Sequence, residues 1–153
     1  NSGYNLRPTD VQAAIGLSQL KSIDYFIKQR NISRNTIIKA LSNDRRWKNQ
    51  VHFIKKNRHV IPSWFGLTMI MNKKFKHTKD SILLKLDRLG VENRPIISGN
   101  FTLQPSAKKY KLVKRKDKFP NVDSIHDLGF FIGLKISKIT DKNLQRFKNI
   151  FKC

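Results

Sequence analysis

The first part of the chain carries apolar residues at helical spacing. Thr9 followed by Gln12 forms the capping-box pattern that starts helices, with Pro8 just before it. Apolar residues then recur every three or four positions, at Val11, Ala14, Ile15, Leu17, Leu20, Ile23, Phe26, Ile27, Ile37, Ile38 and Leu41. The pattern predicts a long amphipathic helix over 6–41 that bends near 31–33.

Shorter apolar stretches follow, and their spacing predicts alternating strands and helices. We expect strands at 51–54, 60–71, 91–97 and 130–134. We expect helices at 78–89, 121–128 and 141–152, capped by Thr78, by Asn121 or Asp123, and by Thr140. Residues 98–118 form the least regular segment. The order predicts an α/β (α+β) domain with helices on one face of a small sheet, without internal repeats.

The chain is strongly basic: it contains 32 Lys and Arg but only 10 Asp and Glu, which gives a formal net charge of +22. A field of this sign attracts polyanions, so one hypothesis is a basic nucleic-acid-binding module. The alternatives are a lysine-rich surface that keeps the domain soluble, or one offset by an acidic partner domain. The bases are spread along the chain except for a dense run at 108–116. We find no zinc-finger spacing, RNA-binding octamer or recognition helix in the sequence.

Composition narrows the class of protein further. The sequence contains no secretory signal and no apolar stretch of the roughly 20 residues that a membrane helix needs. Cys153 is the only cysteine, which excludes an internal disulfide and favours a cytoplasmic setting. The chain begins with Asn1 rather than Met, so we expect a fragment, processing or trimming.

The candidate chemistry is binding rather than bond breaking. The four histidines are scattered, and no His, Cys or Asp cluster has metal-ligand spacing, so we expect no catalytic residue and no metal site. Asn5 and Arg7 precede a helix start, where backbone N–H groups and the helix dipole favour an anion. Arg94 ends a strand and could grip a phosphate or carboxylate, and Asn100 and Gln104 follow in the next loop. Local turn and cap chemistry, or a surface charge, remains the alternative for each.

Several motifs in order resemble one enzyme family. They lie at residues 3–20, 62–66, 90–101, 104–105, 119–123 and 129–134. Together they are similar to the DegT/DnrJ/EryC1/StrS family of sugar-nucleotide aminotransferases. The segments Ser63-Trp64-Phe65-Gly66 and Gly99-Asn100-Phe101 resemble its deoxysugar 3-dehydratase branch, some members of which add an iron–sulfur cluster.

This resemblance implies the C-terminal part of a fold-type I enzyme that uses pyridoxal 5′-phosphate or pyridoxamine 5′-phosphate. We expect an interface loop and long helix over 1–42, a small α/β domain over 43–153, and a large cofactor-binding domain before residue 1. The implied substrate is a nucleotide-linked 4-keto-6-deoxy sugar in deoxysugar or surface-polysaccharide biosynthesis. The family leaves aminotransfer and 3-dehydration open, and by itself this chain is expected to be inactive.

The resemblance also assigns roles to individual residues. Asn5 would reach across a homodimer interface to the cofactor phosphate of the neighbouring subunit. Arg7 would approach the same site and contact the substrate diphosphate. Arg94 and Asn100 would lie near the sugar-nucleotide pocket. The cofactor would carry the hard chemistry, which agrees with a chain that offers no nucleophile of its own.

Overall fold

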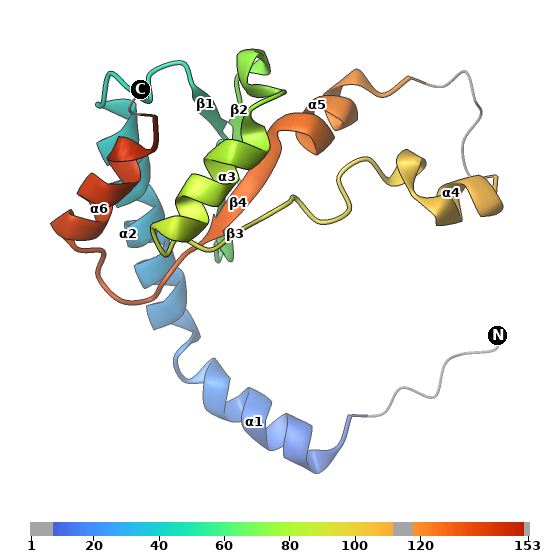
Figure 1. Ribbon diagram of the computed structural model, residues 1–153. Coiled ribbons are helices and arrows are strands. Elements are labelled where there is room, and N and C mark those ends of the chain that lie inside the picture. Colours follow the sequence, from blue (N-terminus) through green and yellow to red (C-terminus); the bar gives the residue numbers. More distant parts are fainter. Residues whose placement is uncertain (1–7, 112–117, 152–153) are drawn as a thin grey trace.

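The computed structural model describes residues 8–111 and 118–151 (Figure 1). The α-helices are α1 (Asp10–Leu20), α2 (Ile23–Ser42), α3 (Lys79–Arg88), α4 (Pro105–Lys109), α5 (Pro120–Leu128) and α6 (Asp141–Lys148). The strands are β1 (Val51–Phe53), β2 (Gly66–Met71), β3 (Asn93–Arg94) and β4 (Gly129–Gly133). Single 3-10 turns lie at η1 (Lys73–Phe75), η2 (Phe101–Leu103) and η3 (Asn149–Phe151).

The strands form an antiparallel sheet in the order β1-β2-β4-β3. Leu67 of β2 faces Ile132 of β4, and Met69 faces Phe130. Because side chains alternate along a strand, these four residues share one face of the sheet. All four are buried, so this face is the core face.

Helices α2, α3 and α6 cover the core face (Figure 1). Ile37 and Leu41 of α2, Leu86 of α3 and Phe147 of α6 pack into the same buried cluster as β2 and β4. On the other face Thr68, Ile70 and Phe131 are only half-buried. This arrangement confirms the predicted small sheet with helices on one face.

The bend in the leading helix lies elsewhere than predicted. The helix breaks at Lys21 and Ser22, and not near 31–33, where α2 runs through without interruption. Packing explains the position: the Asn31 side chain donates to the Pro62 carbonyl oxygen (2.9 Å) and Ser33 to that of Lys135 (3.0 Å). The two side chains fix the middle of α2 to the body. Helix α1 has no buried residue and projects away from the body (Figure 1).

Several predicted elements are shorter than the apolar patterns suggested. The stretch 60–71 forms a strand only from Gly66, because the segment before it bonds to α2 side chains and contains Pro62, which lacks an N–H. Similarly, 91–97 forms a strand only over β3, which ends at Pro95. The predicted cap of the 121–128 helix is wrong, since α5 begins at Pro120 and the Asp123 carboxylate accepts a hydrogen bond from Asn100 instead.

Other local predictions are confirmed. Thr9 and Gln12 form the reciprocal capping box of α1, with donor–acceptor distances of 2.9 and 3.4 Å. Gly90 ends the α3 region with a φ of +73°, the left-handed geometry that glycine adopts without strain. Thr140 caps α6, although the α-helix stops at Lys148 and continues as a 3-10 turn.

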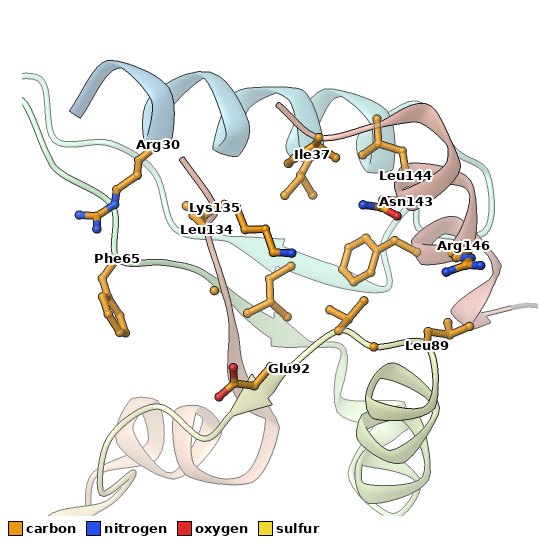
Figure 2. A pocket seen from close by; sticks show the side chains of 16 residues that line it. Arg30, Ile37, Phe65, Leu89, Glu92, Leu134, Lys135, Asn143, Leu144 and Arg146 are labelled. Atoms are coloured by element: carbon orange, nitrogen blue, oxygen red, sulfur yellow. The ribbon is translucent and has the colours of Figure 1, made fainter. Parts of the chain in front are cut away.

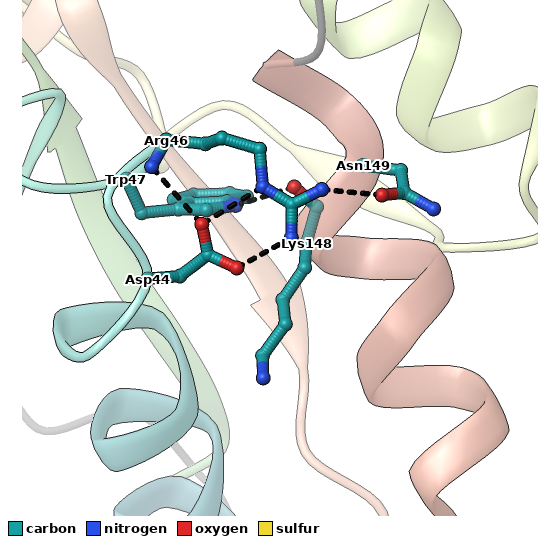
Figure 3. Close-up of polar contacts among 5 residues, drawn as sticks. All are labelled: Asp44, Arg46, Trp47, Lys148 and Asn149. Carbon is teal, nitrogen blue, oxygen red and sulfur yellow. Dashed lines mark hydrogen bonds and ion pairs between the residues drawn. The ribbon is translucent and has the colours of Figure 1, made fainter.

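A polar clamp joins the end of α2 to the C-terminal helix (Figure 3). The Asp44 carboxylate accepts hydrogen bonds from the backbone N–H, Nε and Nη2 of Arg46, and Nη1 of Arg46 donates to Oδ1 of Asn149 (2.5 Å). Beside them, the Trp47 indole N–H donates to the carbonyl oxygen of Lys148 (3.1 Å). The clamp therefore connects residues about a hundred positions apart in the sequence.

Candidate functional site

Arg94 stands on the edge strand of the sheet with its charge in solvent. Strand β3 pairs Arg94 with Phe131 of β4, on the half-buried face. The guanidinium donates through Nε (2.9 Å) and Nη2 (2.6 Å) to one carboxylate oxygen of Glu92. The side chains of Arg94 and Glu92 are 67% and 73% exposed. An ion pair this exposed is weak, so Arg94 can exchange Glu92 for another anion at little cost.

The loop after Arg94 has unusual backbone geometry. Ile97 has a φ of +45°, a conformation that β-branched residues rarely adopt, and is 89% exposed. Phe101 and Leu103 in the same loop are also about half exposed. Strained and exposed apolar residues of this kind concentrate where a loop meets a ligand or a partner. Sequence reasoning missed Ile97, because nothing in an Ile-Ile-Ser-Gly stretch marks which residue takes the left-handed conformation.

Asn100 holds this loop from beneath. It is only 2% exposed, and its side-chain amide donates to Oδ1 of Asp123 at 2.5 Å. Its side-chain oxygen accepts from the backbone N–H (2.9 Å) and the hydroxyl (2.7 Å) of Thr102, and its own backbone N–H donates to Nδ1 of His126 (3.2 Å). Gly99 leaves no room for a Cβ, because His126 packs against it. The observed geometry therefore makes Asn100 an internal support of the loop.

Helix α5, which supplies Asp123 and His126, is itself anchored. Lys76 forms an ion pair with Asp127 (2.8 Å), and this contact lowers the pKa of the Asp127 carboxyl. Nζ of Lys79 donates to the carbonyl oxygen of His126 (3.3 Å), and burial lowers the pKa of the Lys79 ammonium. The support of Asn100 thus extends through α5 to the start of α3.

The two described candidates lie at opposite ends of one loop, Arg94 exposed at its start and Asn100 buried at its end. Gln104, the third polar candidate of this region, donates from its side chain to the Ser98 carbonyl oxygen (3.2 Å) and so closes the same loop. Asn5 and Arg7 lie outside the described residues. Arg94 thus places an exposed positive charge at the start of a loop that Asn100 holds in position. This arrangement suits binding and orienting an anion.

The segment 62–66 connects this side of the sheet to α2. Trp64 packs against the core, and the guanidinium of Arg34 lies 4.3 Å from the centre of its ring. Arg34 is buried and also donates to the Ile54 carbonyl oxygen; burial lowers the pKa of its guanidinium. Phe65 is 75% exposed and lies 6.0 Å from Phe131, ring centre to ring centre.

Within residues 8–111 and 118–151, no three His, Cys, Asp or Glu side chains gather in a way that could hold a metal ion. None of the helices in these ranges is both long and apolar enough to cross a membrane.

Comparison with known proteins identifies the framework that carries this loop. The model of the DegT/DnrJ/EryC1/StrS aminotransferase family matches residues 1–150. The chain therefore belongs to this family, as the sequence motifs predicted. Its structure resembles that of the E. coli GDP-4-keto-6-deoxy-D-mannose-3-dehydratase solved with bound hydrated PLP, with a TM-score of 0.81 and 25% identity over 98% of the chain. Helicobacter pylori PseC, an aminotransferase of pseudoaminic acid biosynthesis, shares the fold with a TM-score of 0.74 and 17% identity.

The curated relatives include both chemistries of the family. A GDP-4-keto-6-deoxy-D-mannose 3-dehydratase of Yersinia pseudotuberculosis is 30% identical over 97% of this chain. A GDP-perosamine synthase of Caulobacter vibrioides is 30% identical over 69% of it. The chain spans only 35% and 28% of these two proteins, and 37% of the E. coli structure. It therefore corresponds to about a third of a complete enzyme of this kind.

Proposed function

We propose that the chain is the C-terminal part of a pyridoxal- or pyridoxamine-phosphate-dependent enzyme acting on a nucleotide-linked 4-keto-6-deoxy sugar. The observation that carries the proposal is the match to the family over 1–150, combined with an exposed arginine at the edge of the sheet. Two observations agree with the dehydratase branch: a relative of that activity is 30% identical over 97% of the chain, and a solved dehydratase resembles its structure with a TM-score of 0.81. GDP-4-keto-6-deoxy-D-mannose is accordingly the first substrate to test.

The cofactor would be held mainly by the large domain that we propose to precede this chain. The described residues around Arg94 and Asn100 offer a cation and side-chain amides, which suit binding of the substrate. Asn5, which the resemblance places on the cofactor phosphate, lies outside the described residues. When bound, the cofactor supplies the electron sink for the reaction. The role of this chain in the proposed enzyme is to bind and orient the substrate.

Arg94 is the residue we assign to the substrate. Its fork of N–H donors fits a phosphate or diphosphate oxygen, and its only ion-pair partner among the described residues, Glu92, is in solvent. Arg7 would contact the same diphosphate. Asn100 would act on the pocket through the loop that it supports, since its side-chain amide is already bonded to Asp123 and Thr102.

The proposed active enzyme is a homodimer whose sites are shared between subunits. Helix α1 supports this part of the proposal, because Val11, Ile15 and Leu17 are each more than 60% exposed and require a covering surface. The residues before α1, Asn5 and Arg7, would then approach the site of the neighbouring subunit. We propose a cytoplasmic location for the enzyme, which a nucleotide-sugar substrate and the single cysteine of this chain favour. One relative is a lipopolysaccharide biosynthesis protein of Salmonella typhimurium, which suggests the same process.

The family match accounts for nearly the whole chain, and for this reason we favour the enzyme over a nucleic-acid-binding module. The charge of +22 then serves a substrate diphosphate and a cofactor phosphate, although it exceeds what they need.

The decisive experiment is to sequence the coding region upstream of Asn1 and assay the encoded protein. We expect a large α/β domain there, and the full protein should convert GDP-4-keto-6-deoxy-D-mannose in the presence of glutamate and pyridoxal phosphate. A 3-deoxy product would assign it to the dehydratases and a 4-amino product to the aminotransferases. The 153-residue chain alone should show no turnover.

Arg94→Gln in the full protein tests the assigned substrate contact. We expect the KM for the nucleotide sugar to rise about tenfold, because a charge-assisted contact to phosphate is lost. Arg88→Gln, which removes an exposed charge from α3, should leave KM unchanged. Turnover by the isolated chain, or an upstream region that encodes no such domain, would reject the proposed function.

A further inference from the structure

A cavity on the core side of the sheet is a second candidate binding site. A cavity of about 710 Å³ opens between α2, the segment after β4, α6 and the turn that joins α3 to β3 (Figure 2). Its walls are mainly apolar, formed by Ile37, Leu89, Val91, Ile132, Leu134, Ile139, Leu144 and Phe147. The volume is in the usual range of small-molecule sites, and the apolar lining is typical of them.

Three cations from three different elements line this cavity. Lys135, in the segment after β4, extends its amine over the middle of the space, while Arg30 of α2 and Arg146 of α6 lie toward its two ends (Figure 2). Glu92 also lines it, but its carboxylate is bonded to Arg94. The cavity therefore combines an apolar interior with an excess of positive charge at its border.

Hydrogen bonds restrain the backbone of Lys135 and the side chain of Arg30. The backbone at Lys135 is fixed by the hydrogen bond from the Ser33 hydroxyl to its carbonyl oxygen (3.0 Å). Arg30 donates from Nη1 to the neutral hydroxyl of Ser63 (3.1 Å), and its buried Nε has no acceptor among the described residues.

The cavity borders the proposed sugar-nucleotide site only at Glu92 and Phe65. Arg94 pairs with Phe131, and both belong to the half-buried face of the sheet. The cavity is lined instead by Ile132, the next residue, whose side chain points to the core face. The apolar interior of the cavity therefore lies on the core face, whereas Arg94 lies on the other face of the sheet.

We propose that this cavity binds a small organic phosphate with an apolar body. The apolar part would occupy the space between Ile37, Leu144 and Phe147, and the phosphate would lie at Lys135 with Arg30 or Arg146 beside it. A ligand must match both the positive charge and the apolar lining of the cavity. Inorganic phosphate lacks the apolar part, and a neutral aromatic compound lacks the negative charge. This site does not depend on the enzyme activity proposed above.

Calorimetric titration of the 153-residue chain with phenyl phosphate, inorganic phosphate and benzyl alcohol tests the site. Phenyl phosphate should bind at least about tenfold more tightly than either of the others, since only it engages both parts of the cavity. Lys135→Gln should weaken phenyl phosphate about tenfold, as expected for the loss of one charge-assisted contact. The side chain is exposed, so the variant should keep its melting temperature.

Two controls separate this site from general attraction to a chain of charge +22. Lys138→Gln removes a nearby exposed charge that does not line the cavity, and it should change the affinity less than twofold. Leu144→Trp should narrow the apolar part of the cavity and weaken phenyl phosphate binding while the fold, followed by circular dichroism, is kept. Equal binding of inorganic and phenyl phosphate, an equal loss in the two lysine variants, or full binding by Leu144→Trp would each overturn the proposal.

Discussion

Asn100 is the polar residue on which the loop after Arg94 depends. Its side chain both donates and accepts within the loop region, and it is almost completely buried. A polar side chain in such a place stabilises the fold only while its hydrogen bonds are made. Its loss should therefore affect the whole loop, including the strained Ile97.

Asn100→Ala should lower the free energy of unfolding by about 1–3 kcal/mol, because the bonds to Asp123 and Thr102 are lost in a buried position. A domain of this size should then melt several degrees lower. Thermal unfolding followed by circular dichroism measures the change. Gln104→Ala removes a more exposed bond in the same loop and should cost less than half as much. Equal costs for the two variants would contradict the supporting role of Asn100.

The sequence identified Arg94 and Asn100 as candidate site residues, but it did not predict which residues they contact. Arg94 could be selected because an arginine before proline ends a strand, and the structure places it there. The bonding of Asn100 to Asp123 and His126 joins residues 23 and 26 positions apart, across a part of the chain with no regular pattern. Periodicity does not reveal such contacts, and so Asp123 was predicted as a helix cap instead.

Helix α1 shows how packing decides the limits of an element. The apolar pattern runs through α1 and α2 alike, yet only α2 is held against the body, by Ile37 and Leu41 and by the side chains of Asn31 and Ser33. The break at Lys21 and Ser22 lies before this packed part, whose first buried residue is Ser33. The sequence thus predicted that a helix exists here, while tertiary contacts determine where it bends.

The contrast between α1 and α2 can be measured. Ile15→Ser on α1 should change the free energy of unfolding by less than about 0.5 kcal/mol, because Ile15 is 61% exposed. Leu41→Ala on α2 should cost about 2–5 kcal/mol, since Leu41 is completely buried. Urea denaturation of the monomeric chain at low concentration gives both values. If Ile15→Ser were as costly as Leu41→Ala, α1 would have to be packed on the body in solution.

Over the whole molecule, charge is distributed unevenly between stabilising contacts and surface. The chain has only 10 Asp and Glu, and three of them form the ion pairs found among the described residues. The clamp at Asp44 is the least exposed of these pairs, with 11% of the carboxylate side chain accessible. It also connects the end of α2 to the C-terminal helix, so its loss should weaken the packing of these two parts of the domain against each other.

The order of elements and the location of the core followed from the sequence, because both depend on apolar periodicity. The clamp did not, since Asp44 and Arg46 lie in a polar stretch that resembles an ordinary loop. Their role depends on Asn149, which is distant in the sequence and contacts the Arg46 guanidinium only in the folded chain. The sequence therefore indicated which layers form, but not the polar contacts that fasten the two ends of the domain together.

Acid should weaken the whole molecule through this clamp. Hydrogen bonding from Arg46 lowers the pKa of Asp44 from 3.8 to about 2. Because the carboxyl is more acidic in the folded than in the unfolded chain, its stabilisation is present above about pH 4 and is lost as the pH falls toward 2. At pH 6, Asp44→Asn should lower the free energy of unfolding by about 1 kcal/mol, after allowance for solvent screening.

The difference between Asp44→Asn and the unmodified chain should shrink as the pH falls through 4 and be mostly lost at pH 2, where the carboxyl is protonated in the unfolded chain and about half protonated in the folded chain. Urea denaturation at pH 6, 4, 3 and 2 measures it. Asp127→Asn is the matched comparison: its pKa is lowered in the same direction by Lys76, but its side chain is 33% exposed, so its effect should be smaller. A difference for Asp44→Asn that stayed constant from pH 6 to pH 2 would show that the amide fails for steric reasons and that the charge of the clamp does not stabilise the fold.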